Sequence, residues 1–228
     1  MFILGDIHGN FNNLIKLIDK IGNTSPIIQV GDFGITNNHG NMKEILNRLN
    51  NKLGEVGNKM YVIRGNHDNP IYWNGDWLLD NIELLPDYSV REIEGKTVLF
   101  VGGALSIDRI PRLMDGGNYY WIDEEFVFDK KKIDELIGID VVITHTAPKF
   151  APPQTINDLV RGFAQYDQPL LHELAIERGE MSEMYELLTK KNYITHWFYG
   201  HFHTNSIYTY ENTDFICVHI DTTHDFRE

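Results

Sequence analysis

The sequence predicts an α/β fold (α+β in its second half) built from two β-sheets flanked by helices. In the first 70 residues, short apolar runs alternate with stretches whose apolar residues recur at helical spacing. From residue 90 the pattern changes to alternating residues around Glu94-Gly95-Lys96, which is typical of a β-hairpin and begins a second sheet. No internal repeat or linker interrupts the 228 residues. We therefore expect one domain over residues 1–228.

The first half of the chain repeats the order strand, polar motif, helix. Strands are predicted at residues 2–4, 27–30 and 60–63, and helices at about 11–21 and 42–49. Each polar motif comes directly after a strand. In open α/β sheets, ligands bind at the carboxyl ends of the strands, where loops and helix N-termini meet. We therefore expect the functional site at this edge.

The second half is predicted to add two helices, four strands and one long loop. The helices are expected at residues 130–137 and 170–188, and the strands at 141–143, 194–199, 205–210 and 215–220. On the longer helix, the pairs His172-Glu173 and Glu177-Arg178 are assigned to the solvent-facing side. Residues 147–168 contain three prolines and are predicted to form a long loop or flap, a kind of segment that is often functional.

Composition and charge narrow the class of protein and of partner. Apolar residues make up 42% of the chain and charged residues 23%, which are ordinary globular values. No apolar run approaches a membrane span and no leader precedes a hydrophobic core, so we expect an unexported, cytoplasmic protein without a membrane partner. Cys217, the only cysteine, lies in an apolar strand and is interpreted as a small core residue. The net charge of −13 disfavours duplex nucleic acid, and an anionic substrate would need bound cations or an arginine cluster.

Five short polar motifs follow five of the predicted strands. They are Gly5-Asp6-Ile7-His8-Gly9-Asn10, Gly31-Asp32-Phe33-Gly34, Gly65-Asn66-His67-Asp68, Thr144-His145-Thr146 and Gly200-His201-Phe202-His203. Taken singly, such motifs can also be explained by structural roles. Asp6 could cap the next helix, as Asn10 could. His201 and His203 could alternate on one strand, so that only one of them faces the site.

The motifs together supply more metal-ligand donors than a protein core needs. The candidate ligands are Asp6, His8, Asp32, Asn66, His145, His201 and His203. Buried carboxylates and imidazoles are costly unless they are paired or metal-bound, and this donor set suits two adjacent divalent transition ions, with Asp32 able to bridge them. We expect Mn²⁺ first, while Fe, Zn, Ni or Co would be accepted by the same donors.

The ordered set D-x-H, G-D-x-x, G-N-H-[DE], a lone histidine and G-H-x-H resembles the calcineurin-like metallophosphoesterases, over the chain from Asp6 to His203. The resemblance implies a four-layer αββα sandwich with a two-metal site at the strand ends. It implies that one ion is held by Asp6, His8, Asp32 and His203, and the other by Asp32, Asn66, His145 and His201. A hydroxide that bridges the ions would attack phosphorus directly.

The G-N-H-D motif carries the remaining roles that the resemblance implies. His67 would contact the phosphate and protonate the leaving oxygen, while Asn66 would also bind substrate. Asp68 is a candidate catalytic residue that either orients a histidine or caps the turn at Asn69-Pro70.

The chain departs from the Ser/Thr protein phosphatase subgroup, which reads G-D-x-V-D-R-G. Ile35 and Thr36 stand where that subgroup has its second aspartate and its arginine, so protein phosphatase activity of that type is disfavoured. Arg64 does match the arginine before G-N-H, but it could equally form a structural salt bridge.

Arg109 and Arg112 are the candidates to replace the missing arginine, because guanidinium groups suit phosphate oxygens. Each could instead be a solvated loop charge. Trp73 and Trp77 could stack on an aromatic leaving group, but packing under the loop is favoured. Five histidines match no motif and are interpreted as surface or core residues: His39, His172, His196, His219 and His224.

The sequence therefore predicts a binuclear metal-dependent phosphoesterase, either a phosphatase or a phosphodiesterase. Its acidic surface favours a small phosphoester, a nucleotide or a phosphopeptide as substrate. The alternative is a non-enzymatic metal-binding scaffold of the same fold. A few relatives that resemble such scaffolds lack the G-N-H histidine, and the presence of His67 weighs against this alternative.

Overall fold

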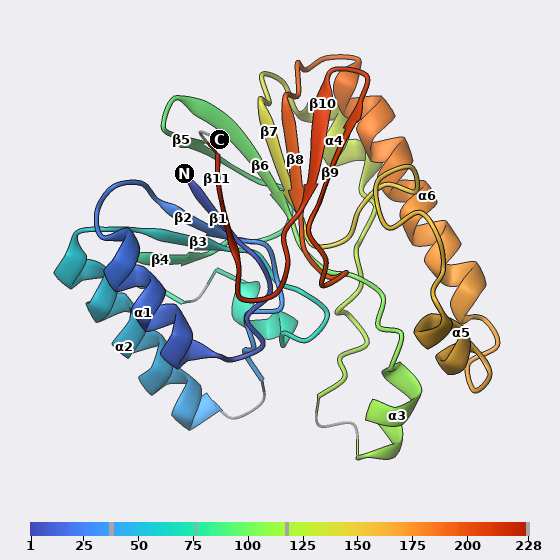
Figure 1. Cartoon of the computed structure of the whole chain (residues 1–228), viewed down its shortest axis with the longest axis horizontal. Helices are drawn as coiled ribbons and strands as arrows, with labels where there is room; N and C mark the ends of the chain where they lie inside the picture. Colours follow the sequence, from blue (N-terminus) through green and yellow to red (C-terminus); the bar gives the residue numbers. More distant parts are fainter. Residues whose placement is uncertain (37–38, 76, 117–118, 227–228) are drawn as a thin grey trace.

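Two β-sheets lie face to face with helices on their outer faces (Figure 1) in the computed structural model, which describes residues 1–36, 39–75, 77–116 and 119–226. The first sheet has the order β11-β1-β2-β3-β4. Its strands are β1 (Phe2–Leu4), β2 (Ile27–Gln29), β3 (Met60–Val62), β4 (Ile82–Leu84) and β11 (Thr223–Asp225). Strands β1 to β4 pair in parallel, and β11 closes the edge antiparallel to β1.

The second sheet has the order β5-β6-β7-β8-β10-β9, with a parallel centre and antiparallel pairs at both edges. Its strands are β5 (Ser89–Ile93), β6 (Lys96–Val101), β7 (Val141–Thr144), β8 (His196–Tyr199), β9 (Ser206–Tyr210) and β10 (Thr213–Cys217). The predicted hairpin is confirmed, and its two-residue turn has Glu94 at φ 51° and Gly95 at φ 73°. Positive φ at both turn positions matches the twist of the strands.

Helices cover the outer face of each sheet, so that the fold has four layers. The first sheet packs against α1 (Phe11–Ile21) and α2 (His39–Val56), and the second against α4 (Lys130–Glu135) and α6 (Leu170–Thr189). Between the sheets, Ile3, Phe100 and Phe198 are fully buried in one apolar layer. The predicted αββα sandwich is confirmed. None of the helices in the described ranges has both the length and the apolar character needed to cross a bilayer.

Several short elements lie outside the sequence prediction. They are β4, β11, the 3₁₀ helix η1 (Pro70–Trp73), α3 (Arg109–Met114) and α5 (Asp158–Ala164). Each is a few residues long, so its conformation depends on neighbouring segments rather than on a local period. Helix α5 lies within the predicted 147–168 loop.

The assignment of Glu177 and Arg178 to the solvent-facing side of α6 is wrong. The Glu177 side chain is buried against the loops after β6 and β7, where it accepts hydrogen bonds from Leu105 N and Thr146 Oγ1. The half-buried Arg178 side chain donates to carbonyl groups of residues 147–153. This face of α6 is polar because it supports loops instead of a sheet.

Candidate metal centre

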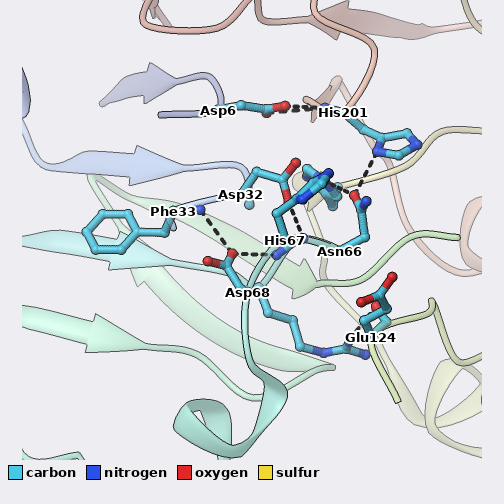
Figure 2. Close-up of polar contacts among 12 residues, drawn as sticks. Asp6, Asp32, Phe33, Asn66, His67, Asp68, Glu124 and His201 are labelled. Carbon is cyan, nitrogen blue, oxygen red and sulfur yellow. Dashed lines mark hydrogen bonds and ion pairs between the residues drawn. The ribbon is translucent and has the colours of Figure 1, made fainter. Parts of the chain in front are cut away.

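Loops from both sheets converge at the carboxyl ends of their parallel strands. The loop after β1 carries Asp6 and His8, the loop after β2 carries Asp32, and the loop after β3 carries Asn66 and His67. The second sheet contributes His145 at the end of β7, and His201 and His203 after β8. Figure 2 shows side chains from both sheets pointing toward one another across this edge.

The first group of donors consists of Asp6, His8, Asp32 and His203, whose ligand atoms all lie within 4.8 Å of one another. His203 Nε2 lies 3.1 Å from Asp6 Oδ2, and His8 Nε2 lies 3.6 Å from Asp32 Oδ2. The two imidazole Nε2 atoms are 3.0 Å apart. Two carboxylates and two imidazoles at this spacing form a donor set that fits one divalent transition ion.

The second group consists of Asp32, His145 and His201. Both imidazoles also approach the side-chain oxygen of Asn66, at 3.0 Å from His145 Nε2 and 2.9 Å from His201 Nδ1. Asp32 therefore belongs to both groups, with Oδ1 toward His145 and Oδ2 toward His8. The structure thus brings all seven sequence-predicted ligand residues to one place.

Hydrogen bonds outside the donor atoms orient these side chains. His145 Nδ1 lies 2.7 Å from Val30 O, so this nitrogen donates to the carbonyl, and Nε2 is the atom that would face a bound ion. Asn66 Nδ2 donates to Ser106 Oγ, which points the amide oxygen at the two histidines. The buried Asp6 carboxylate accepts from the His201 backbone N–H.

Unusual backbone conformations position the donors. His8, Asp32, His201 and His203 have φ values of 42°, 53°, 65° and 49°, in the left-handed region that non-glycine residues rarely adopt. Such conformations persist where surrounding structure imposes them, and they cluster at functional sites. At Gly200, an added Cβ would come within 2.1 Å of Asp6 Oδ1. The glycine lets the backbone approach the carboxylate.

The charges of this cluster are strongly coupled. Burial opposes ionisation of Asp32, but the facing histidines outweigh it and hold the Asp32 pKa well below its ordinary value. Burial likewise opposes protonation of His145, but the charge of Asp32 raises the His145 pKa to about 9. Burial and the charge of His145 hold the pKa of His201 well below its ordinary value. A metal ion would replace the His145 proton as the counter-charge of Asp32.

His67 lies beside the donor groups and also faces a cavity. Its ring is 5.2 Å from the His8 ring, and its backbone N–H donates to Asp32 Oδ1 at 2.8 Å. Burial lowers the pKa of His67, while the charge of Asp32 and, more weakly, that of Asp108 counter this effect. The imidazole is therefore mostly neutral near pH 7, and a bound anion would raise its pKa.

Asp68, a candidate catalytic residue, turns its carboxylate toward backbone N–H groups of two loops. Its side chain is fully buried, and it accepts four backbone hydrogen bonds, from Phe33, Gly34, Ile35 and Gly65, at 2.7 to 3.0 Å. Figure 2 shows the one from Phe33. Burial and the nearby charge of Asp32 raise its pKa to about 6. Asp68 therefore joins the loop after β2 to the loop after β3. The following turn is capped by Asn69.

Arg109 and Arg112 both lie in networks of protein groups. The Arg109 guanidinium pairs with Asp167 and Glu173, and it is 12% exposed. Arg112 lies closer to the centre. It pairs with buried Glu124 at 2.9 Å and donates to the backbone oxygen of Asn66 at 3.1 Å. These contacts tie α3 to the body of the protein, and those of Arg112 help to position Asn66.

Arg64 and the two tryptophans have structural surroundings. Arg64 pairs with Asp87 at 2.6 Å and donates to backbone oxygens of residues 123–125. Trp73 is buried in the core under the first sheet and donates to Val62 O. Trp77 stacks on Tyr72 at 5.0 Å. The packing alternative is therefore confirmed for both tryptophans.

The sequence did not predict the residues that hold the candidate ligands in place through hydrogen bonds. Buried Glu124 accepts hydrogen bonds from Ser106 and Arg112, both of which contact Asn66. Glu177 holds Leu105 and Thr146, which flank Ser106 and His145. None of these residues lies in a recognisable motif.

A cavity of about 670 Å³ opens beside the centre. Asp32, Asn66, His67, His201 and His203 form one wall, and residues of the 147–168 segment and α6 form the opposite wall. The volume is in the range of small-molecule sites.

Comparisons with known proteins give one family and several similar folds. The family model described as calcineurin-like phosphoesterase matches residues 1–205. The structure is similar to that of the phosphopantetheinyl hydrolase PptH from Mycobacterium tuberculosis, with a TM-score of 0.52 and 14% identity over 96% of this chain and 89% of that one. It is also similar to a putative 5′-nucleotidase from Staphylococcus aureus in complex with α-ketoglutarate, with a TM-score of 0.50 and 16% identity over 96% of this chain and 48% of that one. The chain spans about half of that nucleotidase. No curated protein matched the sequence.

We expect Asp68→Asn to lower the free energy of unfolding by about 2–4 kcal/mol, because the amide turns an NH₂ group toward backbone N–H donors. Asp80→Asn, at an exposed position, should change it by less than about 0.5 kcal/mol. Urea unfolding monitored by circular dichroism measures both. Unchanged stability in Asp68→Asn would argue against the cross-linking role.

We expect the buried carboxyl of Glu177 to make the free energy of unfolding of the protein depend on pH. Burial raises its pKa to about 7 from an ordinary 4.5, so the folded state binds the extra proton. The stability that this proton contributes is fully present below about pH 4.5 and is lost as the pH rises through about 7. The free energy of unfolding of Glu177→Gln, relative to that of wild type, should therefore rise by about 2–3 kcal/mol from pH 4.5 to pH 8.

Urea unfolding of both proteins across that range gives the comparison. Glu186→Gln, at an exposed position of the same helix, is the matched control and should follow wild type. If wild type and Glu177→Gln change in parallel with pH, Glu177 is ionised throughout and the prediction is wrong.

Proposed function

The chain belongs to the calcineurin-like phosphoesterase family, and from this premise we propose that it hydrolyses phosphate esters with the help of two divalent metal ions. The observation that carries the proposal is the pair of donor groups that share Asp32. Asp6, His8, Asp32 and His203 would hold one ion, and Asp32, Asn66, His145 and His201 the other. Mn²⁺ is the ion we propose, since oxygen and imidazole donors accept it.

Bound cations are needed for an anionic substrate to enter this site. Asp6 and Asp32 are buried carboxylates, and the whole chain carries a net charge of −13. Without compensation these charges would repel a phosphate group. When bound, two adjacent divalent ions lower the pKa of water and stabilise charge on phosphoryl oxygens during an in-line displacement.

His67 is proposed as the proton donor to the leaving oxygen. It lines the cavity next to Asp32 and Asn66, so its imidazole faces the space that a bound ester would occupy. The charge of a phosphate group would raise its pKa toward neutrality and favour the protonated, donating form. Asn66 is proposed to contact substrate as well as metal.

The substrate is proposed to be a small phosphoester, a nucleotide or a phosphopeptide, cleaved as a monoester or a diester. Protein phosphatase chemistry of the G-D-x-V-D-R-G type is disfavoured because Ile35 and Thr36 replace the two charged residues of that motif. The non-enzymatic scaffold is the second candidate, and it requires that the centre bind metal without turnover.

The proposal is tested by measuring hydrolysis of p-nitrophenyl phosphate and bis-p-nitrophenyl phosphate by Mn²⁺-loaded protein, with bound manganese measured in parallel. We expect two ions per chain, turnover of at least one ester, and loss of activity after chelation. Asp32→Asn should lower both the manganese content and the rate, because both donor groups lose the same carboxylate. Two bound ions with no turnover of either ester would favour the scaffold.

We expect His67→Ala to lower kcat by about 10²–10⁴-fold while the manganese content stays at the wild-type value. The loss should be larger for phenyl esters than for p-nitrophenyl esters, because p-nitrophenolate needs less protonation to leave. His172→Ala, at an exposed position of α6, is the control and should retain wild-type kcat. An equal loss on both classes of ester would argue against proton donation by His67.

A further inference from the structure

The cavity beside the metal centre has two chemically different walls. One wall is polar and belongs to the centre, as described above. The opposite wall is mainly apolar, with Ile156, Leu159, Phe163 and Leu174 among its residues. These side chains come from α5, the segment before it, and the first half of α6. A phosphate held at the metals would therefore have an apolar surface on its far side.

Two of the apolar side chains are open to water. Ile156 is 41% exposed and Leu159 is 62% exposed, although both line the cavity. Large apolar side chains that gather at the mouth of a cavity are typical of a binding site. An apolar group in this space would cover them and gain the free energy of removing apolar surface from water.

Two of the polar side chains of the same wall, Gln154 and Asn157, are engaged with the protein itself, while Lys149 and Thr155 also line the cavity. Gln154 Nε2 donates to Phe150 O, and Asn157 Oδ1 accepts from Val160 N at the start of α5. A nucleobase carries several hydrogen-bonding groups along its edge, and a site that leaves such groups unpaired disfavours the ligand. Because apolar side chains predominate along this wall, it suits a hydrocarbon or aryl group better than a nucleobase.

The base of this wall is held in place before any ligand binds. The Arg178 guanidinium donates to Ala147 O, Pro148 O and Ala151 O, and it lies 5.0 Å from the Phe202 ring. Tyr199 Oη donates to Pro152 O. Figure 1 shows α5 beside the N-terminal end of α6. The hydrogen bonds from Arg178 and Tyr199 fix residues 147–152 at the base of the wall, so binding costs little ordering of this part of the chain.

We propose that the apolar wall binds an aryl or alkyl group that is esterified to the phosphate held at the metal centre. The preferred substrates are then phosphate esters with a bulky apolar group. This inference rests on the proposed phosphoesterase function, which identifies the polar end of the ligand as a phosphate group. Its basis is the continuity of the apolar cavity with the metal centre.

Binding of two non-hydrolysable phosphonates tests the inference independently of turnover. Phenylphosphonate and 4-butylphenylphosphonate share the polar end and differ by four carbons. Each buried methylene raises affinity about threefold to fourfold. We therefore expect the butyl compound to bind the Mn²⁺-loaded protein at least tenfold more tightly by calorimetry, with a more negative heat-capacity change.

Variants on α5 connect this preference to the cavity. Leu159→Ala and Phe163→Ala remove apolar surface and should reduce the ratio of the two Kd values to less than threefold. Arg161→Ala, at an exposed position of the same helix that does not line the cavity, should retain the wild-type ratio. A wild-type ratio below twofold overturns the inference, as does a preference that survives both apolar substitutions. Tighter binding of adenosine 5′-monophosphate than of the butyl compound, lost in the same variants, also overturns it.

Hydrolysis of phenyl and 4-butylphenyl phosphate esters separates this inference from the proposed function. Monoesters or diesters are used, according to which class the protein cleaves. Turnover of both esters with equal kcat/KM contradicts the inference and leaves the phosphoesterase function in place. A strong phosphonate preference with no turnover contradicts the phosphoesterase function and leaves the apolar site in place.

Discussion

The buried carboxylate of Asp32 is the group on which the centre depends. It is 1% exposed, lies where the two sheets meet, and faces histidines from both of them. A buried anion is costly unless positive charge and hydrogen bonds surround it. The His67 backbone N–H, the His145 imidazole and the His8 imidazole supply part of this compensation. The relative position of the two sheets is therefore coupled to the chemistry at their common edge.

The backbone around Asp32 is strained, and identifiable contacts maintain the strain. Asp68 accepts hydrogen bonds from Phe33, Gly34 and Ile35, the three residues that follow Asp32. Gly65 allows the loop after β3 to come within contact of the same carboxylate, since an added Cβ would lie 2.1 Å from Asp32 Oδ1. These contacts hold Asp32 at a positive φ and direct its two oxygens toward different groups of donors.

A second layer of polar residues connects the centre to α6 and to the 147–168 segment. Glu177 contacts the loops after β6 and β7, while Arg178, the next residue, holds the start of the segment that forms the cavity wall. Neighbouring residues on one helix therefore support both the loops beside the candidate metal centre and the apolar wall. A substitution in α6 can therefore change both the loops and the wall without contacting a candidate metal ligand.

The sequence by itself determined the order of the longer elements and the residues that meet at the centre, and its resemblance to a known family indicated the four-layer fold. Polar motifs with fixed spacing follow apolar strands, and the carboxyl ends of parallel strands meet at one edge of a sheet, so local pattern is enough to place Asp6 and Asp32 together. His145 follows a strand of the second sheet, and only the resemblance to the family placed it with them. The tertiary structure alone decided the role of Asp68, the burial of Glu177 and the partners of Arg112. These roles depend on contacts between residues far apart in the chain, such as Glu177 with Leu105, and no local period or motif encodes such contacts.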